Sequence, residues 1–133
     1  MIKALIIDDE AAAANVLQLM IERHIPEITH VRLATKLGEA HALLQQFEPD
    51  IVFLDIMMPE KNGFEFLNEV KNINFEIIFT TAFNEFAIRA IRFSSLDYLL
   101  KPLNAEELRM AVNRYLDKKN HARQTEALLK NLL

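Results

Sequence analysis

Short apolar runs alternate with longer segments of helical periodicity along this chain. Continuous runs rich in β-branched residues lie at about 3–7, 51–54, 76–80 and 97–100, and residues 31–35 form a weaker fifth run. Uninterrupted apolar runs of this length are typical of strands that are buried on both faces of a parallel sheet. The pattern therefore predicts five strands.

Between these runs, apolar residues recur at spacings of three and four, which places them on one face of a helix. Gly38 is expected to open the second helix, and Gly63 marks the turn from a loop into the third. Asn104 precedes two acidic residues and is expected to cap the fifth helix. The five predicted helical faces comprise Val16, Leu17, Met20 and Ile21; Ala40, Leu43, Leu44 and Phe47; Phe66, Leu67 and Val70; Phe86, Ala87, Ala90 and Ile91; and Leu108, Ala111, Val112, Tyr115 and Leu116.

Five strands that alternate with five helices predict an α/β fold, in which helices cover both faces of a mostly parallel, doubly wound sheet. A length of 133 residues suits one domain, and a hydrophobic content of 51% argues against disorder. With 15 basic and 19 acidic residues, the net charge of -4 offers no broad electrostatic footprint for nucleic acid. The sequence has no cysteine, which excludes disulfides and thiolate metal sites.

The character of the chain changes after Tyr115. Residues 117–126 are mostly charged and polar. We expect residues 1–118 to form the domain, and residues 119–133 to be either an extension of the last helix or a linker toward a domain absent here. No apolar run reaches the length of a membrane span and no signal peptide is recognisable, so we expect a cytoplasmic protein without a membrane partner. The chain ends in a short amphipathic segment with Leu128, Leu129, Leu132 and Leu133.

Polar side chains follow four of the predicted strands at the point where each strand ends. Asp8 and Asp9 come after the first strand, Asp55 after the third, Thr81 after the fourth and Lys101 after the fifth. Because the carboxyl ends of parallel strands meet at one edge of an open α/β sheet, these groups are expected to lie together where such sheets bind ligands. The sequence therefore predicts an acidic pocket with one lysine and one hydroxyl.

Such a pocket has a chemistry of its own. Carboxylates hold Mg²⁺, and a carboxylate can also attack phosphorus to form an aspartyl phosphate. Phosphoryl transfer needs positioning and charge neutralisation, which Lys101 and the Thr81 hydroxyl can supply. Each residue alone has an ordinary structural role as a helix cap, a turn residue or a surface lysine. Their common position at the ends of successive strands favours the functional interpretation.

In these residues the chain resembles a response-regulator receiver domain, the phospho-acceptor half of two-component signalling. The resemblance covers about residues 2–118 and implies a flavodoxin-like fold with strand order 2-1-3-4-5. It rests on Asp8-Asp9-Glu10, on Asp55 within the stretch from Val52 to Pro59, on the spacing from Pro59 to Gly63, on Thr81-Ala82 and on Lys101-Pro102.

The resemblance implies a role for each residue of the pocket. Asp55 is the phosphorylated nucleophile and takes its phosphoryl group from a sensor histidine kinase. Asp9 and Asp55 hold Mg²⁺, together with Asp8, directly or through water, and the backbone carbonyl of Met57. Thr81 and Lys101 bind the phosphoryl group.

Further expectations concern the switch. The resemblance implies a cis peptide bond between Lys101 and Pro102. It makes Thr81 and Tyr98 the switch pair, with Tyr98 turning inward when Thr81 moves toward the phosphoryl group. Met57 and Phe83 border the path of an attacking water in this family, and both are apolar here, so we expect slow self-dephosphorylation.

The stretches 81–93 and 96–102 resemble the receivers of LytTR-type transcription regulators, in which a DNA-binding domain follows a short linker. The resemblance implies homodimerisation on phosphorylation through the face of the fourth helix, fifth strand and fifth helix, and contact with DNA only through a C-terminal domain absent here. Phe86 is expected in the core, and Phe83 and Phe93 are expected to be partly exposed.

Two other interpretations remain open. The first is a free-standing receiver or an intermediate of a phosphorelay. The second is a Mg²⁺-dependent phosphohydrolase with an aspartyl nucleophile. That class usually carries Asp-x-Asp, whereas Ile56 and Met57 follow Asp55 here, which favours a signalling module that is not an enzyme.

Overall fold

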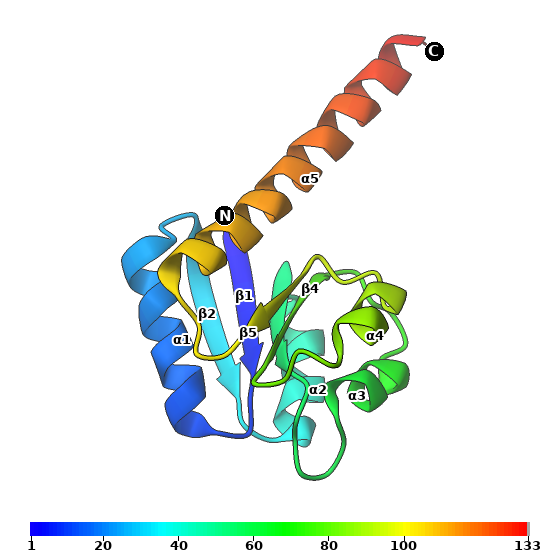
Figure 1. The fold of residues 1–133 in the computed structure, drawn as a ribbon. Helices are drawn as coiled ribbons and strands as arrows, with labels where there is room; N and C mark the ends of the chain where they lie inside the picture. Colours follow the sequence, from blue (N-terminus) through cyan, green and yellow to red (C-terminus); the bar gives the residue numbers. More distant parts are fainter. Residues whose placement is uncertain (133) are drawn as a thin grey trace.

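A five-stranded, fully parallel sheet forms the centre of the molecule (Figure 1). The computed structural model describes residues 1–132. The strand order is β2-β1-β3-β4-β5, as predicted. The strands are β1 (Ile2–Ile7), β2 (Ile28–Ala34), β3 (Ile51–Asp55), β4 (Glu76–Thr81) and β5 (Asp97–Leu100).

Five helices cover the two faces of the sheet (Figure 1). Helices α1 and α5 pack on one face, and α2, α3 and α4 pack on the other, so each face has its own hydrophobic cluster. Among the described residues, no helix combines the length and the apolar character that a membrane span requires. The helices are α1 (Ala11–His24), α2 (Leu37–Phe47), α3 (Gly63–Glu69), α4 (Ala87–Arg92) and α5 (Ala105–Leu132).

The central strands are buried on both sides, which explains their continuous apolar runs. Every residue of β3 is buried, as a strand covered by helices on both faces requires. Two helix caps form, one of which was predicted. Asn62 and Glu65 make a capping box at the start of α3. Asn104 Oδ1 accepts the Glu107 amide proton at 2.8 Å at the start of α5, as predicted.

Two helical faces were predicted wrongly. Val16 was expected on the buried face of α1, but it is 57% exposed, because Leu17 and Ile21 point at the sheet and Val16 lies about a quarter turn away. Ile91 was expected on the buried face of α4, but it is 74% exposed. Helix α4 has six residues, and Ala90 is the one it buries.

Other differences are small. The second strand, predicted at 31–35, begins earlier, at Ile28. Gly38 lies in the first turn of α2, which begins at Leu37. Phe86 packs against the core as expected, and Phe93 is partly buried.

The last helix continues far beyond the sheet. Its first half buries Leu108, Ala111, Val112 and Tyr115, whereas the residues from Asn120 to Leu132 are all exposed. In Figure 1 this second half projects away from the body of the domain. Residues 119–132, which the sequence left open as helix or linker, are therefore helical; Leu133 lies outside the described residues.

Candidate functional site

Three carboxylates meet at the carboxyl edge of the sheet, by which we mean the edge where the parallel strands end. Asp8 and Asp9 follow β1, and Asp55 is the last residue of the adjacent strand β3. Each offers one oxygen, and these oxygens lie within 4.8 Å of one another. Asp8 and Asp55 are 4% and 3% exposed. The structure thus brings together the three acids that the sequence placed at this edge.

The Lys101 ammonium reaches into the same cluster from the end of β5. Its Nζ lies 2.8 Å from Asp8 Oδ2 and 3.6 Å from Asp55 Oδ2. Its backbone amide donates to the Thr81 carbonyl at 2.7 Å, which continues the β4–β5 pairing by one residue and holds the lysine at the edge. The peptide bond from Lys101 to Pro102 is cis, as expected.

Burial and charge set the protonation of the site. Burial raises the pKa of Asp55 to about 7; the Lys101 charge opposes this rise, and the Asp8 charge reinforces it. Burial alone would lower the pKa of Lys101, but its hydrogen bond with Asp8 and the charge of Asp55 raise it above the ordinary value. The cluster therefore carries more negative charge than one lysine can neutralise.

The donor set fits a hard divalent cation. Asp9 Oδ1 is buried and has no hydrogen-bond partner among the described residues. An unsatisfied buried carboxylate oxygen is costly unless an ion or water completes it. Oxygen ligands from a few carboxylates are what Mg²⁺ uses in proteins. Asp55 Oδ1 accepts the Met57 amide proton at 3.2 Å, which places this peptide beside the Asp55 carboxylate; the Met57 carbonyl as a metal ligand stays a prediction.

Gly63 supports the site in a way that the sequence did not reveal. Its amide donates to the Ile56 carbonyl at 2.9 Å, which folds the start of α3 against the end of β3. A Cβ atom at position 63 would lie 3.0 Å from the Asp55 carbonyl oxygen. The close approach favours glycine; the sequence marked this position by its place at a loop-to-helix turn and by the spacing from Pro59 to Gly63, but it did not indicate the contact with Asp55.

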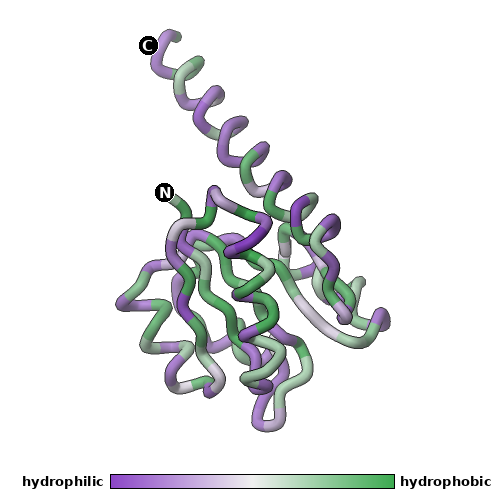
Figure 2. The backbone as a smooth tube through the Cα atoms, turned by 90° about the vertical axis from the view of Figure 1, so that its left-hand side faces the viewer, coloured by the Kyte–Doolittle hydropathy of each residue, from purple (hydrophilic) through white to green (hydrophobic). Residues whose placement is uncertain are grey.

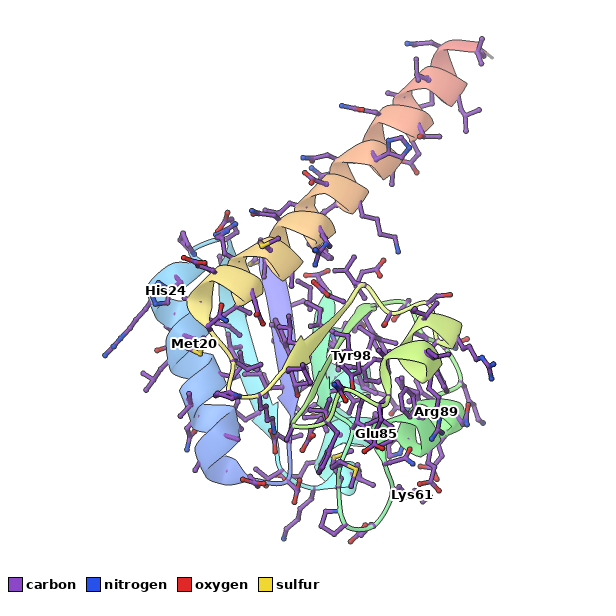
Figure 3. The ribbon with its side chains drawn as sticks, viewed as in Figure 1. Met20, His24, Lys61, Glu85, Arg89 and Tyr98 are labelled. Atoms are coloured by element: carbon purple, nitrogen blue, oxygen red, sulfur yellow. The ribbon has the colours of Figure 1, made fainter. Side chains whose placement is uncertain are left out.

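The backbone of Phe83 connects Thr81 to Tyr98. The Phe83 amide donates to Thr81 Oγ1 at 3.2 Å, and the Phe83 carbonyl accepts a hydrogen bond from the Tyr98 hydroxyl. Thr81 is fully buried, whereas Tyr98 packs its ring against the core with its hydroxyl near the segment that carries Glu85 (Figure 3). Burial raises the pKa of Tyr98. Sequence reasoning named both side chains but missed this backbone link.

A shallow groove runs along the face of α4, β5 and α5. It encloses about 390 Å³ and is lined by both polar and apolar side chains. Tyr98 forms part of its wall, so a movement of this ring would change the groove. Further lining residues are Asn84, Ala87, Leu100, Met110 and Arg114.

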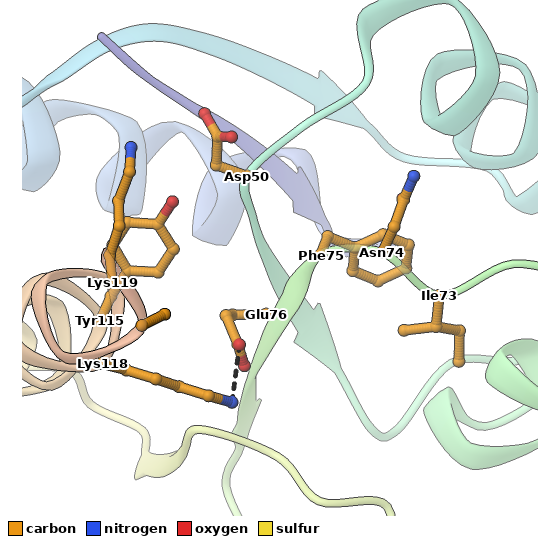
Figure 4. A pocket seen from close by; sticks show the side chains of 9 residues that line it. Asp50, Ile73, Asn74, Phe75, Glu76, Tyr115, Lys118 and Lys119 are labelled. Atoms are coloured by element: carbon orange, nitrogen blue, oxygen red, sulfur yellow. Dashed lines mark ion pairs between the residues drawn. The ribbon is translucent and has the colours of Figure 1, made fainter. Parts of the chain in front are cut away.

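A second groove, of about 390 Å³, lies at the opposite edge of the sheet, where the strands begin (Figure 4). We call this the amino edge. Here each acid has a partner: Lys118 Nζ lies 2.7 Å from Glu76 Oε1, and Asp50 Oδ2 accepts the Lys3 amide proton at 2.8 Å. Both acids of this groove therefore have partners, unlike Asp9 Oδ1 at the carboxyl edge.

Comparison with known proteins gives a consistent result. A family model described as response regulator receiver domain matches residues 4–113. The sensory transduction protein LytT of Bacillus cereus is 35% identical over 132 residues, which are 98% of this chain and 53% of the relative. The transcriptional regulatory protein BtsR of Salmonella typhi is 36% identical over 86% of this chain and 48% of its own length.

Solved structures agree. The REC domain of AraT, a response regulator from Geobacillus stearothermophilus, superposes with a TM-score of 0.79 at 31% identity, covering 92% of this chain and 98% of that one. The chain spans about half the length of the curated relatives it matches.

Proposed function

Because this chain belongs to the response regulator receiver domain family, we propose that Asp55 accepts a phosphoryl group from a sensor histidine kinase. Receiver domains are the signalling modules that take phosphate from such kinases. The observation that carries the proposal is the position of Asp55, buried 3.6 Å from Lys101 and beside two further carboxylates. The arrangement can hold a nucleophile, a cation and a transferred anion together.

In the transfer, an Asp55 carboxylate oxygen forms a bond to phosphorus while the nitrogen–phosphorus bond of the kinase phosphohistidine breaks, and the electron pair returns to the imidazole. Asp8, Asp9 and Asp55 would hold Mg²⁺, with the Met57 carbonyl as a further ligand. Bound Mg²⁺ would neutralise the phosphoryl oxygens and favour the ionised carboxylate. Lys101, which now lies between Asp8 and Asp55, can turn its ammonium to a phosphoryl oxygen.

The switch then follows from the contacts of Phe83. A phosphoryl group on Asp55 offers acceptor oxygens for the Thr81 hydroxyl. If Thr81 turns toward them, its hydroxyl leaves the Phe83 amide, and the β4–α4 segment that also binds Tyr98 is free to shift. Phosphorylation thereby favours one arrangement of the face formed by α4, β5 and α5.

The output belongs to a larger protein. We propose that this chain is the receiver of a LytTR-type transcription regulator, with residues 1–118 as the receiver domain, which dimerises on phosphorylation and contacts DNA only through a C-terminal domain. The names of LytT and BtsR, and their length of about twice this chain, support this. Self-dephosphorylation is expected to be slow, because Met57 and Phe83 give an attacking water no polar side chain.

The test is intact-mass spectrometry after incubation with acetyl phosphate, with and without Mg²⁺. We expect one phosphoryl adduct that requires Mg²⁺, decays slowly after the donor is removed, and is absent in Asp55→Asn. The matched control is Glu10→Gln, which removes the charge of an exposed residue beside the cluster. This variant should still form the adduct. An adduct of equal yield in Asp55→Asn would contradict the proposal.

A further inference from the structure

Beyond Ala122, which lines the amino-edge groove, the projecting half of α5 makes no ion pair or hydrogen bond with the body of its domain over the residues described. Lys118 is the last residue that pairs with the body, through Glu76, and Lys119 lies over the Tyr115 ring with its Nζ 5.9 Å from the ring centre (Figure 4). The thirteen exposed residues from Asn120 to Leu132 extend for about 20 Å at 1.5 Å per residue. An isolated helix of this length is marginal in water, so a contact along this half would stabilise it.

Large apolar side chains nevertheless gather at its end. Leu128, Leu129 and Leu132 are 66%, 56% and 81% exposed, and Figure 2 shows hydrophobic colour returning at the end of an otherwise polar helix. With Ala122 and Thr125 they form one stripe, which we call the leucine face. Ala122, Thr125, Leu129 and Leu132 follow the alternating spacing of three and four that defines the seam of a two-helix coil.

We infer that this leucine face pairs in parallel with the same face of a second copy of the chain. The inference deepens the proposed function by giving its homodimer a second contact surface. In this register Ala122 and Leu129 take the a positions of the heptad, and Thr125 and Leu132 take the d positions. The fixed charges of the segment, on Arg123, Glu126 and Lys130, all lie off the seam.

The flanking polar residues select the parallel direction. In a parallel pair His121 takes a g position and faces Glu126 of the second copy at an e position, a pairing that allows a hydrogen bond or an ion pair. An antiparallel pair over the same residues would instead set Leu129 against Thr125, and Leu132 against Ala122, of the other chain. Symmetric parallel packing sets leucine against leucine, which buries the most apolar surface.

The leucine face also continues a surface of the receiver body. Leu128 follows Met110, and Leu132 follows Arg114, by about five whole turns at 3.6 residues per turn. Met110 and Arg114 line the groove that Tyr98 shares. Two chains that meet along their projecting helices therefore also turn these groove walls toward one another.

The inferred contact between the two leucine faces is small. Five side chains per copy are far fewer than the roughly 20–30 residues per partner in a standard interface. The pair is therefore weak by itself, and a change at the groove that Tyr98 shares can strengthen or weaken it. This is a useful property in a signalling dimer.

The first test uses cysteine cross-linking, which the chain permits because it has no cysteine of its own. Thr125→Cys places a thiol on the seam, and Ala127→Cys places one on the opposite side of the same helix. Under mild oxidation we expect a disulfide-linked dimer from the first and not from the second. Equal cross-linking of both, or none from Thr125→Cys while the chain is dimeric, would overturn the parallel pair.

The second test compares two double variants. The leucine variant combines Leu129→Gln with Leu132→Gln, and the control combines Ala127→Gln with Asn131→Gln. All four positions are exposed, so both variants should fold. By sedimentation equilibrium up to about 1 mM, we expect the leucine variant to dimerise at least about tenfold more weakly, and the control unchanged. A wild-type chain that stays monomeric throughout would show that something else covers the leucine face, which would overturn the inference.

The same proteins separate this inference from the proposed function. Both tests use the unphosphorylated chain, and both variants should take up a phosphoryl group from acetyl phosphate as readily as the wild type. If the chain forms a seam-specific dimer but never forms the phosphoryl adduct, the proposed function is contradicted and the inferred helix pair still stands.

Discussion

Both edges of the sheet carry acidic side chains and a lysine. The acids have partners at the amino edge, whereas the carboxyl edge has more acids than its lysine can neutralise. At the amino edge Glu76 is paired with Lys118, and Asp50 accepts a backbone amide proton. At the carboxyl edge Lys101 serves both Asp8 and Asp55, and Asp9 keeps a buried oxygen without a partner among the described residues. The groove at the amino edge encloses about 390 Å³ and the groove that Asp9 lines encloses about 420 Å³, so volume does not distinguish the two edges. Unbalanced buried charge distinguishes the two edges. Such charge is costly, and it is retained where a bound ligand can balance it.

The largest expected effect tests whether the lysines of the two edges differ in function. Lys101→Met keeps the apolar stem and removes the ammonium from the carboxyl edge. We expect phosphoryl uptake to slow by about 10²-fold, the size typical of losing one preorganised group that stabilises a transferring anion. The measurement is the initial rate of adduct formation by intact mass.

The matched control is Lys118→Met at the amino edge, which removes an exposed ion pair worth at most about 1 kcal/mol and should leave the rate unchanged. If Lys118→Met slowed uptake as much as Lys101→Met, the contrast between the edges would fail.

The next effect concerns stability and pH in the absence of Mg²⁺. Because the pKa of Asp55 rises from its ordinary 3.8 to about 7, the folded chain keeps a proton that the unfolded chain has lost, and stability falls as pH rises through this window. Asp55→Asn removes the penalty. We expect it to raise the free energy of unfolding by roughly 2 kcal/mol near pH 8, after discounting for water access, and by much less near pH 4.5.

Chemical denaturation in EDTA at the two pH values measures this gain. Adding Mg²⁺ to the wild type should narrow the gap near pH 8, since the cation balances the same charge. A gain that is equal at both pH values would mean that the carboxyl charge is not its source.

The smallest effect compares the two glycines. Gly63→Ala forces a Cβ to within 3.0 Å of the Asp55 carbonyl oxygen, so we expect a loss of about 1–2 kcal/mol in unfolding free energy. Gly38→Ala meets nothing within 4 Å and lies in a helix, where alanine should stabilise by up to about 1 kcal/mol. Thermal and denaturant unfolding of both variants give the comparison. Equal behaviour would mean that α3 can move away from the site at no cost.

Much of the fold and the edge cluster could be predicted from the chain. Continuous apolar runs located the five strands, and polar residues directly after them located Asp8, Asp55 and Lys101. The errors were on helix surfaces. Val16 and Ile91 fit a periodic stripe, but a stripe does not say which part of it the sheet covers, and a six-residue α4 covers little.

The backbone contacts of the site could not be predicted from the sequence either. The approach of Gly63 to Asp55, and the two hydrogen bonds of the Phe83 backbone, join segments that pass each other only after the strands have aligned. Apart from proline, every residue offers the same backbone groups, so a sequence pattern does not indicate which of them will lie beside Asp55.

The sequence by itself determined the order of strands and helices, the acids, hydroxyl and lysine at the strand ends, and the leucine spacing of the last helix. These depend on side-chain type and local periodicity. Only the tertiary structure decided which charges stay unbalanced. The pKa of Asp55 depends on its burial at the end of β3 and on Asp8 and Lys101, which lie 47 and 46 residues away along the chain. Electrostatic energy depends on distance in space and on exclusion of water, and both arise when the sheet closes.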